Sequence, residues 1–224
     1  MRAELSLLAE IVSLSCDPGV NVDEFHGRVA SSHDLSAEVV RAGNSALYGM
    51  AGKIDRLERA VMILGPRTVA SIAAAVVVRH TLGNASIGGL ASEAIWLHSL
   101  ETGVCARRLA GHLAPRLEHE AYLAGLLHHL GTLELFDAHA GACSAFPEVL
   151  QGALGGLQAD GPSRSLAALV RAAHAAVRDP CAGWKDDTPG DEQLLADLGL
   201  LDGEQSELRR EIRDRTKELA AVFG

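Results

Sequence analysis

Histidine is the residue type through which this sequence could bind a metal ion or move a proton. The chain contains 10 histidines, and several lie in segments whose apolar residues repeat at helical spacing. His98 shares a helical face with apolar residues, and His174 lies beside the apolar stripe of another segment. His128 and His129 are adjacent and follow a run of small and apolar residues. Neutral imidazole is a common ligand of zinc, copper, iron and nickel, so three helices that direct these side chains inward would form a metal site.

A structural role is the alternative for the same four histidines. A buried imidazole can satisfy one backbone carbonyl or pack at the edge of a core without binding any ligand. This second interpretation is the ordinary one for any single histidine, whereas the convergence of several favours a site. Both interpretations stay open on the sequence alone.

Helical periodicity predicts that the elements positioning these histidines are all α-helices. The chain is 48% hydrophobic but only 4% aromatic, a balance that suits close-packed helices better than sheets. Asn44-Ser45 is expected to open a polar turn, and Gly65-Pro66 to end one helix and begin the next. The expected helices are one before Asp17 and then 22–30, 35–42, 54–64, 68–80, 91–113, 118–136, 163–178 and 204–223.

Two helical subdomains are expected to pack together into one module. Residues 81–90 are uncharged and rich in glycine, which marks a joint between an N-terminal subdomain, 1–85, and a second subdomain, 86–224. Residues 138–163 are expected to be mostly loop. The last helix is expected to bury Leu208, Ile212, Leu219 and Val222 and to carry a Glu211–Arg215 pair on its solvated face.

Composition and charge argue against several classes of function. The net charge of −9 and the absence of a basic cluster argue against nucleic acid or a membrane as partner. The first 14 residues are too short and too charged for a membrane span and lack the cleavage site of a signal peptide. The scattered cysteines, Cys16, Cys105, Cys143 and Cys181, indicate reduced thiols in a cytoplasmic protein.

Several motifs, in the right order along the chain, resemble the HDOD branch of the HD superfamily of metal-dependent phosphohydrolases. This resemblance implies an N-terminal helical subdomain packed on a degenerate HD-like one. The residues that carry it are Leu35-Ser36-Ala37, Asn44-Ser45-Ala-Leu-Tyr48-Gly49, Ile54–Gly65, Trp96-Leu-His98 and Gly125-Leu-Leu-His128-His129-Leu-Gly131.

The resemblance also locates the remains of a metal site. HD hydrolases use a histidine, an adjacent His-Asp pair and a distant aspartate, which correspond to His98, His128 with His129, and a position near His174. Histidine thus stands at both carboxylate positions. Imidazole cannot bridge two metal ions as a carboxylate does, so hydrolysis of phosphoesters is not expected. We therefore expect no catalytic residue, no cofactor-binding residue and no cofactor.

The HDOD resemblance implies a non-enzymatic bacterial signalling module that acts through protein–protein contacts. The expected partners are other signalling proteins, such as receiver or cyclic-dinucleotide-related domains, bound through the Asn44–Tyr48 turn or the last helix. The alternative is a metal-binding HD-type domain with residual phosphohydrolase activity. In that case His98, His128 and His129, with His174 as a fourth ligand, would hold one transition metal such as zinc.

Overall fold

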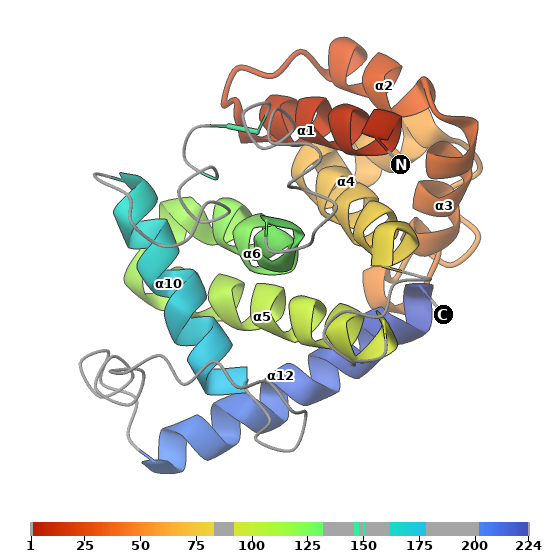
Figure 1. Cartoon of the computed structure of the whole chain (residues 1–224). Helices are drawn as coiled ribbons and strands as arrows, with labels where there is room; N and C mark the ends of the chain where they lie inside the picture. Colours follow the sequence, from red (N-terminus) through yellow and green to blue (C-terminus); the bar gives the residue numbers. More distant parts are fainter. Residues whose placement is uncertain are drawn as a thin grey trace.

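The computed structural model describes residues 2–82, 92–131, 146–147, 150, 162–177 and 202–223, and helices are the only regular elements in these ranges. The predicted all-α class is therefore confirmed (Figure 1). The elements are α1 (Arg2–Cys16), α2 (Val22–Ala30), α3 (His33–Gly43), η1 (Ala46–Tyr48), α4 (Leu57–Leu82), α5 (Ser92–Leu113), η2 (Pro115–Leu117), α6 (Glu118–Leu127), η3 (His128–Gly131), α10 (Pro162–Val177) and α12 (Asp202–Phe223).

Two predicted boundaries differ from the observed ones. The helix expected over 118–136 ends at Leu127, after which the chain tightens into the 3-10 turn η3. The helix expected from residue 54 begins at Leu57. The remainder of the 118–136 segment, most of the 81–90 joint and nearly all of the 138–163 loop lie outside the described residues.

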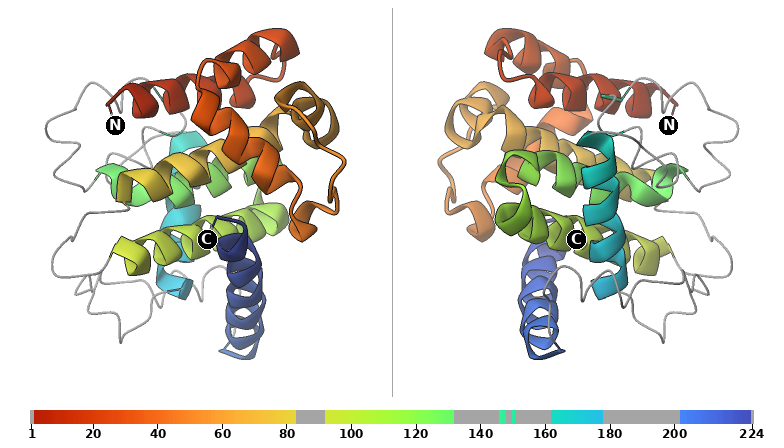
Figure 2. Two further views of the ribbon diagram at one scale, coloured as in Figure 1. Left: turned by 90° about the vertical axis from the view of Figure 1, so that its right-hand side faces the viewer. Right: turned by 90° about the vertical axis from the view of Figure 1, so that its left-hand side faces the viewer.

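The long helix α4 lies at the centre of the N-terminal half and joins it to the rest of the chain. It packs against α1, α2 and α3 on one side and against α5 and α6 on the other (Figures 1 and 2). In turn, α5 contacts α6, α10 and α12, and α10 lies across α5 and α6. The division at residues 85 and 86 stays a prediction.

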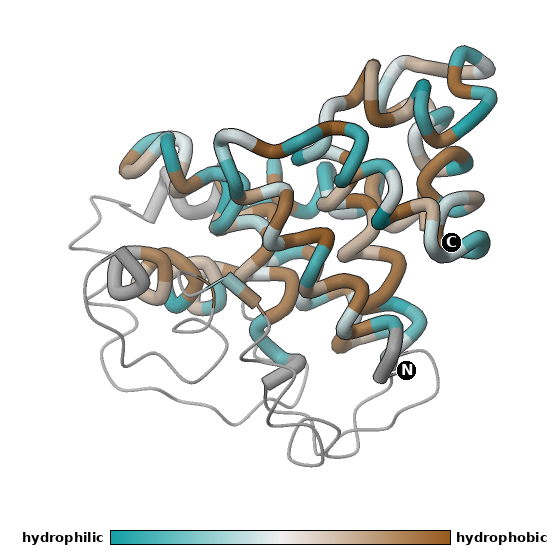
Figure 3. The backbone as a smooth tube through the Cα atoms, turned by 90° about the horizontal axis from the view of Figure 1, so that it is seen from above, coloured by the Kyte–Doolittle hydropathy of each residue, from teal (hydrophilic) through white to brown (hydrophobic). Residues whose placement is uncertain are grey.

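Part of α4 is apolar and long enough to cross a membrane, but its packing is that of a core helix. In the candidate stretch, Leu57–Thr81, 56% of the most apolar window is buried inside the protein. Gly65 also interrupts this stretch with φ 78° and ψ 158°, and Pro66 starts the second part, as the sequence predicted. Other helices carry hydrophobic residues on one face and hydrophilic residues on the other, which is the amphipathic pattern of a packed bundle (Figure 3).

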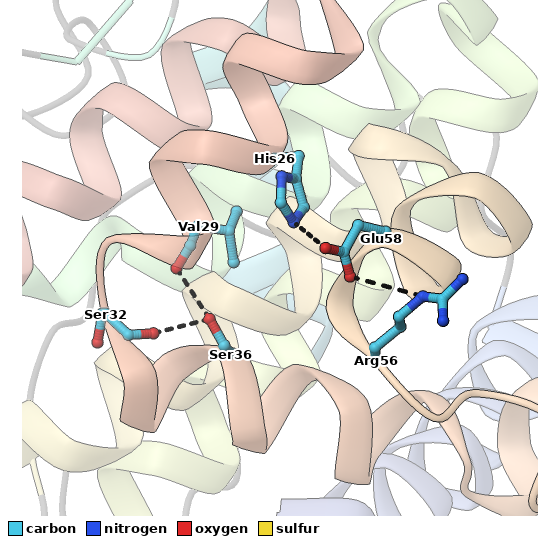
Figure 4. Close-up of polar contacts among 6 residues, drawn as sticks. All are labelled: His26, Val29, Ser32, Ser36, Arg56 and Glu58. Carbon is cyan, nitrogen blue, oxygen red and sulfur yellow. Dashed lines mark hydrogen bonds and ion pairs between the residues drawn. The ribbon is translucent and has the colours of Figure 1, made fainter.

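Side-chain hydrogen bonds and ion pairs hold the N-terminal helices together (Figure 4). Asn21 caps α2 by accepting hydrogen bonds from the amides of Asp23 and Glu24. The Ser36 hydroxyl lies 2.8 Å from the Ser32 carbonyl and 3.1 Å from that of Val29, so it links α3 to the end of α2.

The turn after α3 is closed by one side chain. The Asn44 amide nitrogen donates to the Ile54 carbonyl at 2.5 Å, and its amide oxygen accepts from the Ile54 amide at 3.0 Å. Because both polar ends of Asn44 are used, its role is structural, as expected of a polar turn. The same pair explains why residue 54 is not part of α4.

The final helix, α12, returns to the N-terminal half. Arg41 of α3 donates to the Val222 carbonyl at 2.7 Å. The predicted apolar stripe is largely correct, since Ile212, Leu219 and Val222 are buried. The expected Glu211–Arg215 pair is wrong, because Glu211 contacts Arg108 of α5 and Arg215 contacts Glu218.

Helices α5 and α6 cross closely in the core. At this point Gly103 and Gly125 face each other without side chains between them. A Cβ atom built on Gly125 would lie 2.8 Å from the Gly103 Cα and 2.8 Å from the Thr102 carbonyl oxygen. Neither neighbour can move away cheaply, since both are backbone atoms of a packed helix. The crossing therefore requires glycine at this position.

Replacement of Gly125 by alanine is expected to destabilise the protein by about 1–3 kcal/mol, because the added methyl group forces α5 and α6 apart. Gly27→Ala is the matched control, since a Cβ at that exposed position in α2 meets nothing within 4 Å. The control should be neutral or gain up to about 1 kcal/mol through helix propensity. Urea denaturation of both variants makes the comparison, and equal stabilities would contradict the argument.

A buried histidine also joins α1 to α6 through a hydrogen bond. The Ser15 hydroxyl donates to the Val12 carbonyl at 2.8 Å, so its oxygen is left to accept from the His119 Nε2–H group at 2.9 Å. Burial, aided by Arg67 and Arg107 nearby, lowers the pKa of His119 to about 3. His119 is thus neutral in the folded state over a wide range of pH.

Acid is expected to weaken the fold through His119. Between its folded pKa of about 3 and its unfolded value of 6.5, the unfolded chain binds one more proton. Stability from this group is therefore complete above pH 6.5 and is lost as the pH falls. His119→Gln should remove up to about 1.4 kcal/mol per pH unit from the slope of unfolding free energy between pH 6 and 4. Denaturation of this variant and of the exposed His33→Gln control measures both slopes, and parallel curves for wild type and His119→Gln would refute the prediction.

Candidate metal centre

Four histidines from three parts of the chain meet in one cluster, here called the histidine cluster. They are His98 on α5, His128 and His129 in η3 directly after α6, and His174 on α10. One ring nitrogen from each lies within 4.8 Å of the others. The ring centroids of His128 and His129 are 3.8 Å apart, and those of His98 and His174 are 4.9 Å apart. All four sequence-predicted residues are brought together, while their binding of a metal stays a prediction.

The amphipathic faces of the helices explain why the histidines point to one place. His98 lies on the α5 face that buries Ile95, Thr102 and Cys105. His174 lies beside the buried stripe of α10, which includes Val170 and Ala173. The packing of α10 across α5 and α6 then brings both imidazoles to the end of α6.

A backbone carbonyl fixes the orientation of His128. Its Nδ1 atom lies 2.6 Å from the carbonyl oxygen of Gly125, so Nδ1 carries the proton and donates. Its Nε2 atom is buried, belongs to the cluster side of the ring and has no hydrogen-bond partner among the described residues. Metal-binding histidines commonly donate their second nitrogen to a carbonyl in this way, which leaves the other lone pair for the ion.

Thr102 supports the neighbouring imidazole of His98. Its hydroxyl donates to the His98 carbonyl at 2.8 Å, one helical turn back. The same oxygen lies 3.5 Å from His98 Nε2, which is longer than an ordinary hydrogen bond. The contact limits where the ring can lie without engaging its nitrogen strongly.

Burial keeps these imidazoles neutral and therefore able to act as ligands. Desolvation lowers the pKa of His98 to about 3, with a further contribution from His174. Desolvation, then His98 and His174, lowers the pKa of His128 to about 3 against the opposing hydrogen bond to Gly125. The pKa of His129 is lowered further, first by burial and then by its three neighbours.

The donor set fits one transition metal better than two hard ions. Among the described residues, the group of mutually close ligand atoms consists of imidazole nitrogens alone. In a tetrahedral zinc site with bonds of about 2.0–2.1 Å, ligand nitrogens lie roughly 3.3 Å apart. Contacts of up to 4.8 Å need only a modest contraction of the cluster to reach that geometry.

Sequence reasoning did not find the groups that orient the cluster. It placed Gly125 on a face of small residues, but no sequence signal shows that its carbonyl accepts from His128. It also passed over His119, whose burial depends on the contact of α1 with α6. Both features arise from helix packing rather than from local pattern.

Comparisons with known proteins agree with this architecture. The sequence model of the HDOD domain matches residues 5–153. Among solved structures, an HDOD domain protein of unknown function from Geobacter sulfurreducens has a TM-score of 0.61 and 18% identity, over 96% of this chain and 90% of that one. A protein from Shewanella amazonensis SB2B, named provisionally as a phosphohydrolase, has a TM-score of 0.60 and 20% identity, over 97% and 93%. No curated protein matches. At these identities the structural likeness shows the fold, and the matched family segment contains three of the cluster histidines but not His174.

Proposed function

Because this chain belongs to the HDOD domain family, we propose that it is a non-enzymatic regulatory module that works by binding other signalling proteins. The observation that carries this proposal is the donor set of the histidine cluster. It consists of four imidazoles and occupies the place where the HD resemblance expects a mixture of histidine and aspartate.

Imidazole-only ligation removes what two-metal hydrolysis requires. Carboxylates bridge two cations, offset their charge and help to hold a hydroxide nucleophile between them. A neutral imidazole has one lone pair and no charge, so two buried dications would face strong repulsion in this cluster. The residue corresponding to the aspartate of the HD pair is His129, which lies within the cluster and cannot take over the bridging role.

Two exposed apolar side chains on α4 offer a contact surface for a partner protein. Met62 is 81% exposed and Ile63 is 40% exposed, and both lie on α4 just before the break at Gly65. Adjacent exposed apolar side chains are common at contact surfaces, so this pair supports the binding interpretation. The Asn44–Tyr48 turn is less suitable, because the Asn44 side chain is already committed to Ile54.

A second, compatible role is favoured by the buried Nε2 atom of His128, which has no hydrogen-bond partner among the described residues. In this proposal the histidine cluster holds one transition metal such as zinc. Four protein ligands complete a tetrahedral shell and leave no open position for a water molecule, which is typical of structural rather than catalytic zinc. The ion would then fasten α10 to α5 and α6.

The non-enzymatic proposal predicts no phosphoester hydrolysis above background. Purified protein loaded separately with zinc, manganese and nickel should cleave bis(p-nitrophenyl) phosphate no faster than His128→Ala treated identically. The chemical reason is the missing carboxylate bridge. A metal-dependent rate that disappears in His128→Ala would reject the proposal.

The metal proposal predicts about one equivalent of zinc per chain after incubation with zinc and removal of the excess. His128→Ala and His174→Ala should each lose most of this metal, while the exposed His112→Ala variant, with its histidine outside the cluster, should retain it. Elemental analysis gives the stoichiometry, and circular dichroism verifies folding. Wild-type protein that stays folded but retains no zinc would exclude the metal role without affecting the hydrolysis test.

A further inference from the structure

A cavity of about 970 Å³ lies apart from the histidine cluster, and none of the four cluster histidines lines it. Its walls come from η1, α4, α5, the η2–α6 junction and α12. Pockets that bind small organic ligands typically measure about 300–1,000 Å³. This cavity, here called the arginine pocket, is therefore large enough for a ligand of nucleotide size.

The arginine pocket is lined by arginines of α4, α5 and α12 and by the acidic residues Glu118, Glu211, Asp214 and Glu218. Arg108 pairs with Glu211 at 3.1 Å, and Arg215 pairs with Glu218 at 2.8 Å. Arg67 of α4 and Arg107 of α5 also line the pocket, but neither side chain forms an ion pair or hydrogen bond within the described part of the chain. Two guanidinium groups on different helices thus line the same pocket without an ion pair to the described residues, and their forked donors match phosphate oxygens.

The hydroxyl of Tyr122 is also available in this pocket. Tyr122 of α6 lines the cavity, is only 5% exposed and makes no hydrogen bond through its hydroxyl to the described residues. Burial raises the pKa of this phenol, so it remains a donor at neutral pH.

His119 supplies an acceptor next to this donor. Its Nε2–H group is committed to the Ser15 oxygen, which leaves Nδ1 with a lone pair. His119 lines the same cavity, and Arg67 and Arg107 lie near enough to affect its pKa. The pocket therefore combines two unpaired cations, one unpaired donor and one acceptor with a fixed tautomer.

We propose that the arginine pocket binds a nucleotide-sized phosphorylated small molecule, with Arg67 and Arg107 holding the phosphate and Tyr122 and His119 contacting its organic part. The proposal does not depend on the metal role or on the absence of hydrolysis. Such a ligand could regulate the protein, because a molecule held between α4, α5, α6 and α12 contacts both halves of the chain.

The test is calorimetric titration of the metal-free full chain with ATP, GMP, adenosine and inorganic phosphate. ATP or GMP should bind with measurable heat, adenosine should not bind, and inorganic phosphate should bind more weakly than the nucleotides. Arg67→Gln and Arg107→Gln should each weaken binding about 10-fold or more, the loss expected for a charged hydrogen bond. Arg213→Gln is the matched control, since Arg213 is an exposed arginine of α12 that does not line the pocket.

Tyr122→Phe separates a binding role from a structural one. The hydroxyl has no partner among the described residues, so its removal should leave the unfolding free energy unchanged while weakening nucleotide binding several-fold. Failure of both nucleotides to bind wild type at about millimolar concentration would overturn the proposal. Equal weakening by Arg213→Gln would also overturn it, because the attraction would then be a general effect of surface charge. Adenosine binding as tightly as GMP would remove the role assigned to phosphate.

Discussion

The close crossing of α5 and α6 is the constraint on which the rest of the structure depends. Gly103 and Gly125 allow the two backbones to touch, and the same contact sets the geometry of the histidine cluster. The Gly125 carbonyl orients His128, and Thr102, whose own carbonyl lies against Gly125, supports His98. Two helices held farther apart would separate both imidazoles and the groups that orient them. The close packing of α5 and α6 therefore also determines the positions of His98 and His128.

The sequence predicted the helices well because their apolar periodicity and their glycine and proline punctuation are local signals. Helical phase alone placed His98 and His174 toward the interior, and the family motif identified His128 with His129. What it missed depends on contacts between distant segments. Glu211 pairs with Arg108 rather than Arg215, because α12 lies against α5. The helix predicted over 118–136 ends earlier, at Leu127, because nothing in the apolar pattern marks the change to a 3-10 turn at His128.

The chemistry of the cluster follows from the presence of four imidazoles, and no carboxylate, among its mutually close ligand atoms in the described residues. Carboxylates in the same interior would carry charge and require cations, whereas the imidazoles of His98, His128 and His129 stay neutral without an ion. The neutral imidazoles therefore present nitrogen lone pairs without adding charge to the interior. The family match ends at residue 153, so His174 joins the cluster from outside the matched segment.

Helix α6 connects the arginine pocket to the histidine cluster. His119 lies in its first turn, beside the arginine pocket, and His128 follows its last residue, in the histidine cluster. Eight residues of α6 lie between them, and nine steps of 1.5 Å give a rise of about 13 Å along this short buried helix. A shift of α6 along its axis would therefore move His119 and His128 together. If a ligand in the arginine pocket changes the affinity of the histidine cluster for a metal ion by some factor, the metal ion must change the affinity of the pocket for that ligand by the same factor.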